Sequence, residues 1–235
     1  MTRVSARKAN RSSGLPAADR ECWNRLYSNA SICELPWFAR RPFAPLVRAV
    51  SEGRIEPPGP LLDVGCGLGA NALWLASRGF RVVGIDVAPG AIAAAESRRT
   101  SKDLSVRFLT DDILASLLPS ARFRSAVDIG CFQTLPRRTR GAYADNLARV
   151  LRPNAVLALF WVAREETGAW GPPHRLSVGE VVESFEPKFR VDRVEFRPRS
   201  VRLTDRIKKT SRPLATLAGY TAYLIRRDQP QPPPQ

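Results

Sequence analysis

The stretch that decides the fold is Leu61-Leu62-Asp63-Val64-Gly65-Cys66-Gly67-Leu68-Gly69-Ala70-Asn71, followed by Val82-Val83-Gly84-Ile85-Asp86. In each run, apolar residues lead to an acidic residue. The first run continues into a glycine-rich turn and then a helical pattern that Gly79 ends. This order predicts a strand-turn-helix-strand unit whose first turn brings the backbone close to a ligand, since glycine accepts positive φ and has no Cβ.

Two classes of ligand use such a turn, and the acidic residues separate them. Gly65, Gly67 and Ala70 satisfy the G-x-G-x-x-G/A pattern of dinucleotide enzymes, and Asp86 lies where their ribose-binding acid is expected. Asp63 does not fit, because a carboxylate two residues before the first glycine would repel a pyrophosphate. It suits instead the cationic amino-acid end of S-adenosylmethionine, directly or through water. An α/β protein with no ligand at this turn is the third reading.

The acid-x-G-x-G turn resembles motif I of the class I methyltransferases, and Asp86 matches their ribose-binding acid. The family carries an acid after the third strand that binds the adenine amine, and here Asp112 or Asp111 matches it. The resemblance implies S-adenosylmethionine as the cofactor. It also implies that the cofactor contacts are Trp37, Asp63, Gly65, Cys66, Gly67, Gly69, Asn71, Asp86, Val87, Asp111, Asp112, Ile113, Gly130 and Cys131.

Three further segments resemble the small-molecule branch that contains the thiopurine and tellurite-resistance methyltransferases. They are the aromatic entry segment Trp23 to Trp37, the turn Gly130-Cys131-Phe132 with the helix after it, and Gly171-Pro172-Pro173. Relatives often carry a histidine where this chain has Gln133. The glutamine affects what the resemblance implies about the acceptor and not about the cofactor.

Strands that alternate with helices predict a doubly wound, mostly parallel α/β sheet. The final two strands are joined without a helix, which predicts that the last strand is antiparallel. The resemblance extends the sheet to seven strands, with a helical lid at the N-terminus. We expect a basic disordered tail over 1–18, the catalytic domain over 19–228 and a Pro/Gln-rich tail over 229–235. The aromatic residues of the entry segment either pack a helix from Asp19 onto the sheet or close over the cofactor.

Composition limits the class of protein. No apolar run reaches the roughly 20 residues that span a bilayer, so we expect a soluble protein without a membrane partner. The four cysteines form no C-x-x-C pair. This favours reduced thiols in a cytoplasmic protein over disulfides or a metal site. The basic tail also allows a transit peptide, although it has no clear amphipathic face.

The net charge of +15 is concentrated away from the expected site. Residues 1–18 carry +4 and residues 197–212 carry +6, whereas 61–130 carry only +1. The basic segment 197–212 leaves a nucleic-acid methyltransferase as an alternative. However, the fourth strand is followed by Gly130-Cys131-Phe132-Gln133 and not by the Asn/Asp-Pro-Pro-Tyr/Phe element of enzymes that methylate a base amine. We therefore expect no nucleic-acid partner.

Few residues can act as a base on the acceptor. Gln133 can orient an acceptor but cannot take its proton, and His174 is the single histidine. These two are the candidate catalytic residues, and His174 is alternatively a solvent-facing loop residue. A scarcity of bases favours a small-molecule acceptor with a thiol or another soft or heterocyclic nucleophile, since a thiol is already partly ionised at neutral pH. A protein that binds the cofactor without turnover is a further alternative.

Overall fold

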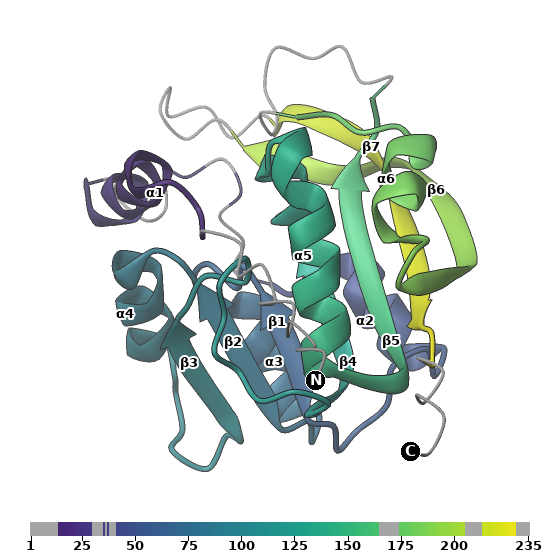
Figure 1. The fold of residues 1–235 in the computed structure, drawn as a ribbon. Coiled ribbons are helices and arrows are strands. Elements are labelled where there is room, and N and C mark those ends of the chain that lie inside the picture. The colour runs from purple at the N-terminus through teal and green to yellow at the C-terminus, as the bar shows by residue number, and fades with distance from the viewer. Residues whose placement is uncertain are drawn as a thin grey trace, which may run out of the picture.

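A seven-stranded sheet organises the computed structural model, which describes residues 14–29, 35, 37, 41–164, 174–204 and 213–228. The strand order is β3-β2-β1-β4-β5-β7-β6 (Figure 1). The strands are β1 (Leu61–Val64), β2 (Val82–Asp86), β3 (Val106–Thr110), β4 (Phe123–Ile129), β5 (Leu151–Val162), β6 (Phe189–Thr204) and β7 (Pro213–Arg226). The helices are α1 (Ala17–Asn29), α2 (Ala44–Ser51), α3 (Ala70–Ser77), α4 (Pro89–Ser97), α5 (Arg137–Val150) and α6 (Val178–Phe185), with a 3-10 turn η2 at Phe132–Thr134.

The expected direction of the strands is confirmed. β1 to β5 pair in parallel, whereas β7 is antiparallel to both β5 and β6. Strands β6 and β7 are long, since residues 197–204 continue β6 and residues 213–218 belong to β7. Part of the basic segment 197–212 is therefore strand, and residues 205–212 lie outside the described residues.

Helices cover both faces of the sheet. One apolar cluster contains side chains of α5 and α6, including Tyr143, Leu147 and Phe185, and a second contains side chains of α2 and α3, including Leu46 and Leu75. The strands between them are apolar on both faces, as expected for a buried parallel sheet. All four residues of β1 are buried, including Asp63.

The unit β1–α3–β2 forms as predicted. Gly69 precedes α3 with a φ of 73°, and a Cβ at this position would lie 2.7 Å from Cζ of Phe108. Only glycine therefore allows α3 to begin this close to β3. The parallel register of β1 and β2 places Asp63 beside Gly84. The acidic residues that end both strands consequently lie at one edge of the sheet.

The N-terminal helix begins earlier than the sequence indicated. We expected Asp19 to start it, but α1 begins at Ala17, and Leu15 before it is buried with 6% of its surface exposed. Helix α1 packs on α4, at the left of Figure 1. Asn24 accepts a hydrogen bond from the backbone N–H of Gly90 at 3.1 Å. Residues 14–18, which the sequence assigned to a tail, thus join the folded part of the chain.

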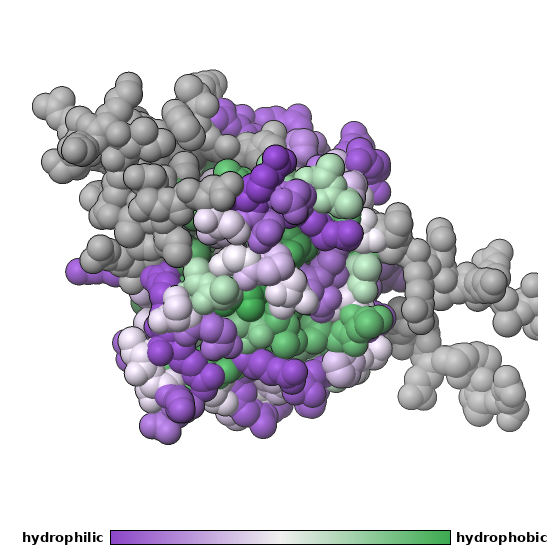
Figure 2. Space-filling model, turned by 90° about the vertical axis from the view of Figure 1, so that its left-hand side faces the viewer, coloured by the Kyte–Doolittle hydropathy of each residue, from purple (hydrophilic) through white to green (hydrophobic). Residues whose placement is uncertain are grey.

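The surface on the side of α1, α4 and β3 is partly apolar. Figure 2 shows an apolar band between polar margins on this face. Leu26 of α1 and the neighbouring Trp37 are large apolar residues with 38% and 46% of their surface exposed. Among the described residues, no helix combines the length and apolar character needed to cross a bilayer.

Candidate functional site

Three buried carboxylates meet at the carboxyl edge of the sheet. Asp63 of β1, Asp86 at the end of β2 and Asp128 of β4 expose 2%, 8% and 0% of their surface. They come from three adjacent strands, because β1 lies between β2 and β4. Ligands of open α/β sheets bind at this edge. The edge is therefore the candidate site, and it concentrates acidic groups.

Of the three carboxylates, Asp63 has the fewest hydrogen-bond partners. Its Oδ2 atom is buried and has no hydrogen-bond partner among the described residues. Burial, with repulsion from Asp128 and Asp86, raises the pKa of Asp63 to about 7, against a hydrogen bond from the backbone of Ala72. A buried carboxylate without a partner is costly unless a cation or donor reaches it. The site therefore offers a cationic group a specific partner.

The glycine turn holds the backbone close to this carboxylate. A Cβ at Gly65 would lie 2.6 Å from the Cβ of Cys131, so the turns that follow β1 and β4 pack directly on one another. A Cβ at Gly67 would lie 3.1 Å from the hydroxyl of Tyr27 in α1. The expected residues Gly65, Gly67 and Cys131 are thus brought together. Burial raises the pKa values of the Cys66 and Cys131 thiols, which keeps both protonated at neutral pH.

Asp86 stabilises the glycine turn through hydrogen bonds to its backbone. Its two carboxylate oxygens accept the backbone N–H groups of Gly67 at 2.9 Å and of Ala88 at 3.0 Å. Burial raises the pKa of Asp86, and these hydrogen bonds oppose the shift. Each carboxylate oxygen can accept a second hydrogen bond. Asp86 can therefore hold the turn and still accept from ligand hydroxyl groups.

Two further acidic residues, Asp111 and Asp112, follow β3, and Asp112 contacts the N-terminal segment. Asp111 accepts a hydrogen bond from the hydroxyl of Ser116 at 2.6 Å, whereas Asp112 accepts the backbone N–H of Leu15 at 2.5 Å. Ile113 is buried, and Val87 is partly buried against the same apolar cluster. Asp112 retains 14% exposure of its side chain. The two acids that the sequence could not separate therefore differ, and Asp112 is the one that contacts another part of the chain.

Asp128 and Tyr143 fix the turn after β4, and neither residue was assigned a role from the sequence. Asp128 accepts the backbone N–H groups of Cys131 at 2.8 Å and Phe132 at 2.9 Å, and the hydroxyl of Tyr143 donates to it as well. Burial raises the pKa of Asp128 to about 6 despite these donors. An acid within an apolar strand was the only sequence signal. Gly130, with a φ of 93°, allows the sharp turn that follows.

Gln133 is hydrogen-bonded to the end of β5, and His174 lies two residues before a bridge to the same end of the strand. The side-chain oxygen of Gln133 accepts the backbone N–H of Val162 at 2.8 Å, and Gln133 is buried. Two residues after His174, Leu176 forms a bridge with Ala163. His174 itself is half-buried. The predicted loop Gly171-Pro172-Pro173 lies outside the described residues.

Two further expected contacts also have structural partners. The side-chain oxygen of Asn71 accepts the backbone N–H of Phe43 at 2.9 Å, which ties α3 to the start of α2. The indole N–H of Trp37 donates to the hydroxyl of Tyr27 at 3.2 Å, and its ring packs edge-on against Trp23. Both residues therefore support the elements around the glycine turn.

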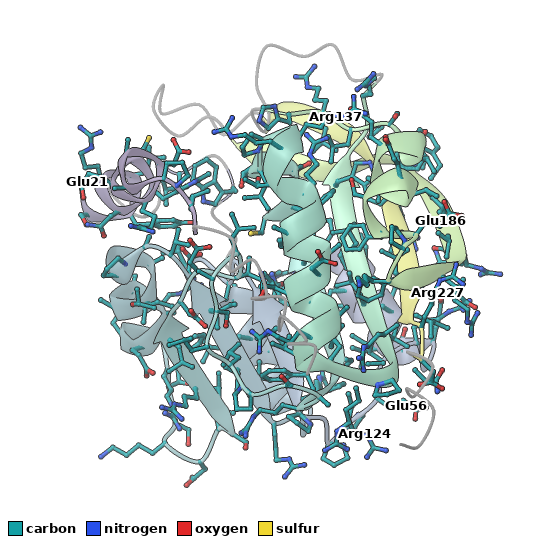
Figure 3. All side chains as sticks on the ribbon, in the orientation of Figure 1. Glu21, Glu56, Arg124, Arg137, Glu186 and Arg227 are labelled. Atoms are coloured by element: carbon teal, nitrogen blue, oxygen red, sulfur yellow. The ribbon has the colours of Figure 1, made fainter. Side chains whose placement is uncertain are left out.

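A separate cavity lies at the opposite edge of the sheet. Glu56 and Arg124 mark it at the bottom of Figure 3, far from Glu21 on α1. The Oγ atom of Ser125 in its lining is buried and has no partner among the described residues. None of the predicted site residues lines this cavity, so it is distinct from the carboxyl edge.

Comparisons with known proteins agree with this geometry. Residues 61–154 match the family model described as a methyltransferase domain. The chain is similar to 2-heptyl-1-hydroxyquinolin-4(1H)-one methyltransferase of Mycobacteroides abscessus, with 31% identity covering 67% of this chain and 69% of that relative. It is also similar to thiopurine S-methyltransferase of Legionella pneumophila, with 26% identity covering 70% and 79%. The structure of a SAM-dependent methyltransferase from Methanosarcina mazei has a TM-score of 0.63 and 21% identity, covering 76% and 97%.

We predict that cofactor binding releases a proton from Asp63. A bound ammonium group stabilises the ionised carboxylate, so the pKa of about 7 in the free protein falls on binding. Affinity for S-adenosylhomocysteine should rise from pH 5.5 to 7, by up to about tenfold per pH unit, and level off above. Calorimetry in buffers of different ionisation heat measures both effects. Asp63→Asn should bind more weakly with a flat pH profile. Asp145→Asn, at an exposed position of α5, should behave as wild type. A flat wild-type profile would contradict the assignment.

We predict that Tyr143→Phe destabilises the fold through Asp128. The change leaves a buried carboxylate without one of its three donors, and the loss of a hydrogen bond to a charged group costs about 1.5–3 kcal/mol. Tyr223→Phe is the matched control, because the buried Tyr223 hydroxyl has no partner among the described residues. Its change should be close to neutral in urea unfolding. Equal losses for both variants would show that the Tyr143 contact is energetically unimportant.

Proposed function

The chain belongs to the class I S-adenosylmethionine-dependent methyltransferases, and we propose that it methylates a small-molecule acceptor at a thiol or another soft or heterocyclic nucleophile. The observation that carries the proposal is that the described residues around the turn after β4 offer few proton acceptors. The acceptor must then bring its own nucleophile in a reactive state.

The described residues fit the cofactor. The unpartnered Oδ2 of Asp63 suits its ammonium group, the glycine turn allows close approach, and Asp86 can accept from the ribose hydroxyl groups. Asp112 suits the adenine amine. When bound, the cofactor supplies the electrophilic methyl carbon of a sulfonium. The protein then has to position the acceptor, exclude water and, where needed, take up a proton.

The groups near the turn after β4 are poor bases. Gln133 is an amide whose oxygen already accepts from Val162, so it can offer only its N–H groups to an acceptor. Burial raises the pKa values of Cys131 and Tyr143, so both stay protonated at neutral pH. Asp128 ionises near pH 6 but is fully buried behind its three donors. His174 is the remaining candidate base.

The names of the relatives support the same acceptor class. One acts on a hydroxyquinolinone, a heterocycle, and another is a thiopurine S-methyltransferase. Both are small-molecule enzymes, and neither name specifies an acceptor for this chain. We therefore propose the shared chemistry, a flat heterocyclic or sulfur nucleophile, and place Gln133 and His174 beside it as polar contacts.

A panel of acceptors tests the proposal. Purified protein with S-adenosylmethionine should methylate some of the thiols, selenols, phenols and heterocycles, measured by mass spectrometry of the products. For a thiol acceptor the rate should follow the ionisation of the acceptor, because the thiolate and not the thiol is the nucleophile. Single-stranded and duplex nucleic acids complete the panel. Methylation of nucleic acid alone would overturn the proposal, as would cofactor binding without turnover on any acceptor class.

We predict that His174→Ala keeps kcat within about threefold when the acceptor is a thiol, since such an acceptor needs no base. The measurement is kcat against pH at saturating cofactor. Saturation removes the contribution of Asp63, whose pKa of about 7 would otherwise imitate a histidine in kcat/KM. Because His174 is the only histidine, an acidic limb of kcat that disappears in the variant would identify it as the base and contradict this prediction.

A further inference from the structure

The segment before α1 is held on the end of β3 by a closed set of contacts. The backbone N–H of Leu15 donates to Oδ2 of Asp112 at 2.5 Å. The guanidinium of Arg20 donates to the carbonyl of Leu15 at 2.8 Å, and the same nitrogen lies 3.9 Å from Oδ2 of Asp112. The three residues thus connect the N-terminal segment to the acid that we assign to the adenine amine.

Gly14 lies directly against the carboxylate of Asp112. A Cβ on Gly14 would lie 2.5 Å from Oδ2 of Asp112 and 3.2 Å from the Cβ of Ala115. A Cβ at position 14 would therefore displace either the segment or the carboxylate and so disturb the contact between them. The φ of Gly14 is not in the left-handed region, so the requirement for glycine here comes from space and not from backbone conformation.

The Leu15 side chain anchors the segment independently of the hydrogen bonds. It is buried in the same apolar cluster as Ile113 and Leu114, the two residues after Asp112. The other carboxylate oxygen of Asp112 accepts the backbone N–H of Leu114 at 2.9 Å. Each oxygen of Asp112 thus has one backbone donor, which fixes the orientation of the carboxylate.

We propose that residues 14–20 form a clasp that builds the adenine side of the cofactor site by orienting Asp112. A carboxylate has about four acceptor positions, so Asp112 can accept an exocyclic amine while the Leu15 amide stays bound. The clasp spares the ligand the cost of ordering this carboxylate. Because coupling is reciprocal, the bound cofactor also stabilises the clasp. The proposal depends on the cofactor and is independent of the acceptor.

This inference changes what we expect of an N-terminal truncation. From the sequence we expected residues 1–18 to form a disordered tail, which would be dispensable for binding. Within this range, Gly14 and Leu15 take part in the clasp, whereas residues 1–13 are not part of it. Removal of residues 1–13 should leave the affinity for S-adenosylhomocysteine within about twofold of wild type, whereas removal of residues 1–16 should weaken it at least about tenfold, in line with one charge-assisted hydrogen bond.

The test uses calorimetry on the full chain as well as on the truncations. Gly14→Ala keeps every other residue and should also weaken binding about tenfold. Gly141→Ala is the matched control, because nothing lies within 4 Å of a Cβ at Gly141 in α5. In an Asp112→Ala background, Gly14→Ala should cause no further loss, since the carboxylate that it displaces is gone. Hydrogen exchange of the Leu15 amide should slow when S-adenosylhomocysteine binds.

Three results would overturn the clasp. One is equal affinity of the two truncated proteins, and another is tighter binding after removal of residues 1–16, which would mean that the segment competes with the cofactor. The third is a full effect of Gly14→Ala in the Asp112→Ala background, which would show that it does not act through this carboxylate. Thermal unfolding of each variant confirms that the protein measured is folded.

Discussion

The confinement of three carboxylates to one buried edge is the constraint on which the rest of the site depends. Burial raises the pKa values of Asp63, Asp86 and Asp128, and repulsion from the other two carboxylates raises that of Asp63 further. Asp86 and Asp128 offset the cost with backbone N–H groups from the turns that they brace. Asp63 keeps one oxygen without a partner among the described residues. We therefore expect the ammonium group of the ligand to be the partner of this oxygen.

The same constraint explains why the two turns are built together. The carboxylate of Asp86 fixes the glycine turn, and that of Asp128 fixes the turn after β4. The turns touch where Gly65 faces Cys131. A change in either acid should thus move both sides of the site, the one that holds the cofactor and the one that faces the acceptor. Gln133 extends the connection to β5 through the N–H of Val162.

The sequence predicted those parts of the protein whose signals are local. The strand pattern, the glycine spacing and the acid that ends each strand were sufficient for the β1–α3–β2 unit and its cofactor. The contacts that the sequence missed join distant positions. The bond from Tyr143 to Asp128 spans 15 residues, and that from Leu15 to Asp112 spans 97. No periodicity encodes such pairs, because they form only when the sheet brings the elements together.

The charge state of Asp63 tests the account most directly. Carbon-13 NMR of labelled aspartate carboxyl groups, assigned with Asp63→Asn, follows its titration in the free protein and with S-adenosylhomocysteine bound. The account predicts a midpoint near 7 in the free protein, and a fall of at least about one unit once an ammonium group lies against Oδ2. A midpoint that stays the same on binding would contradict it, because the cofactor's cation would then not be the partner of Asp63.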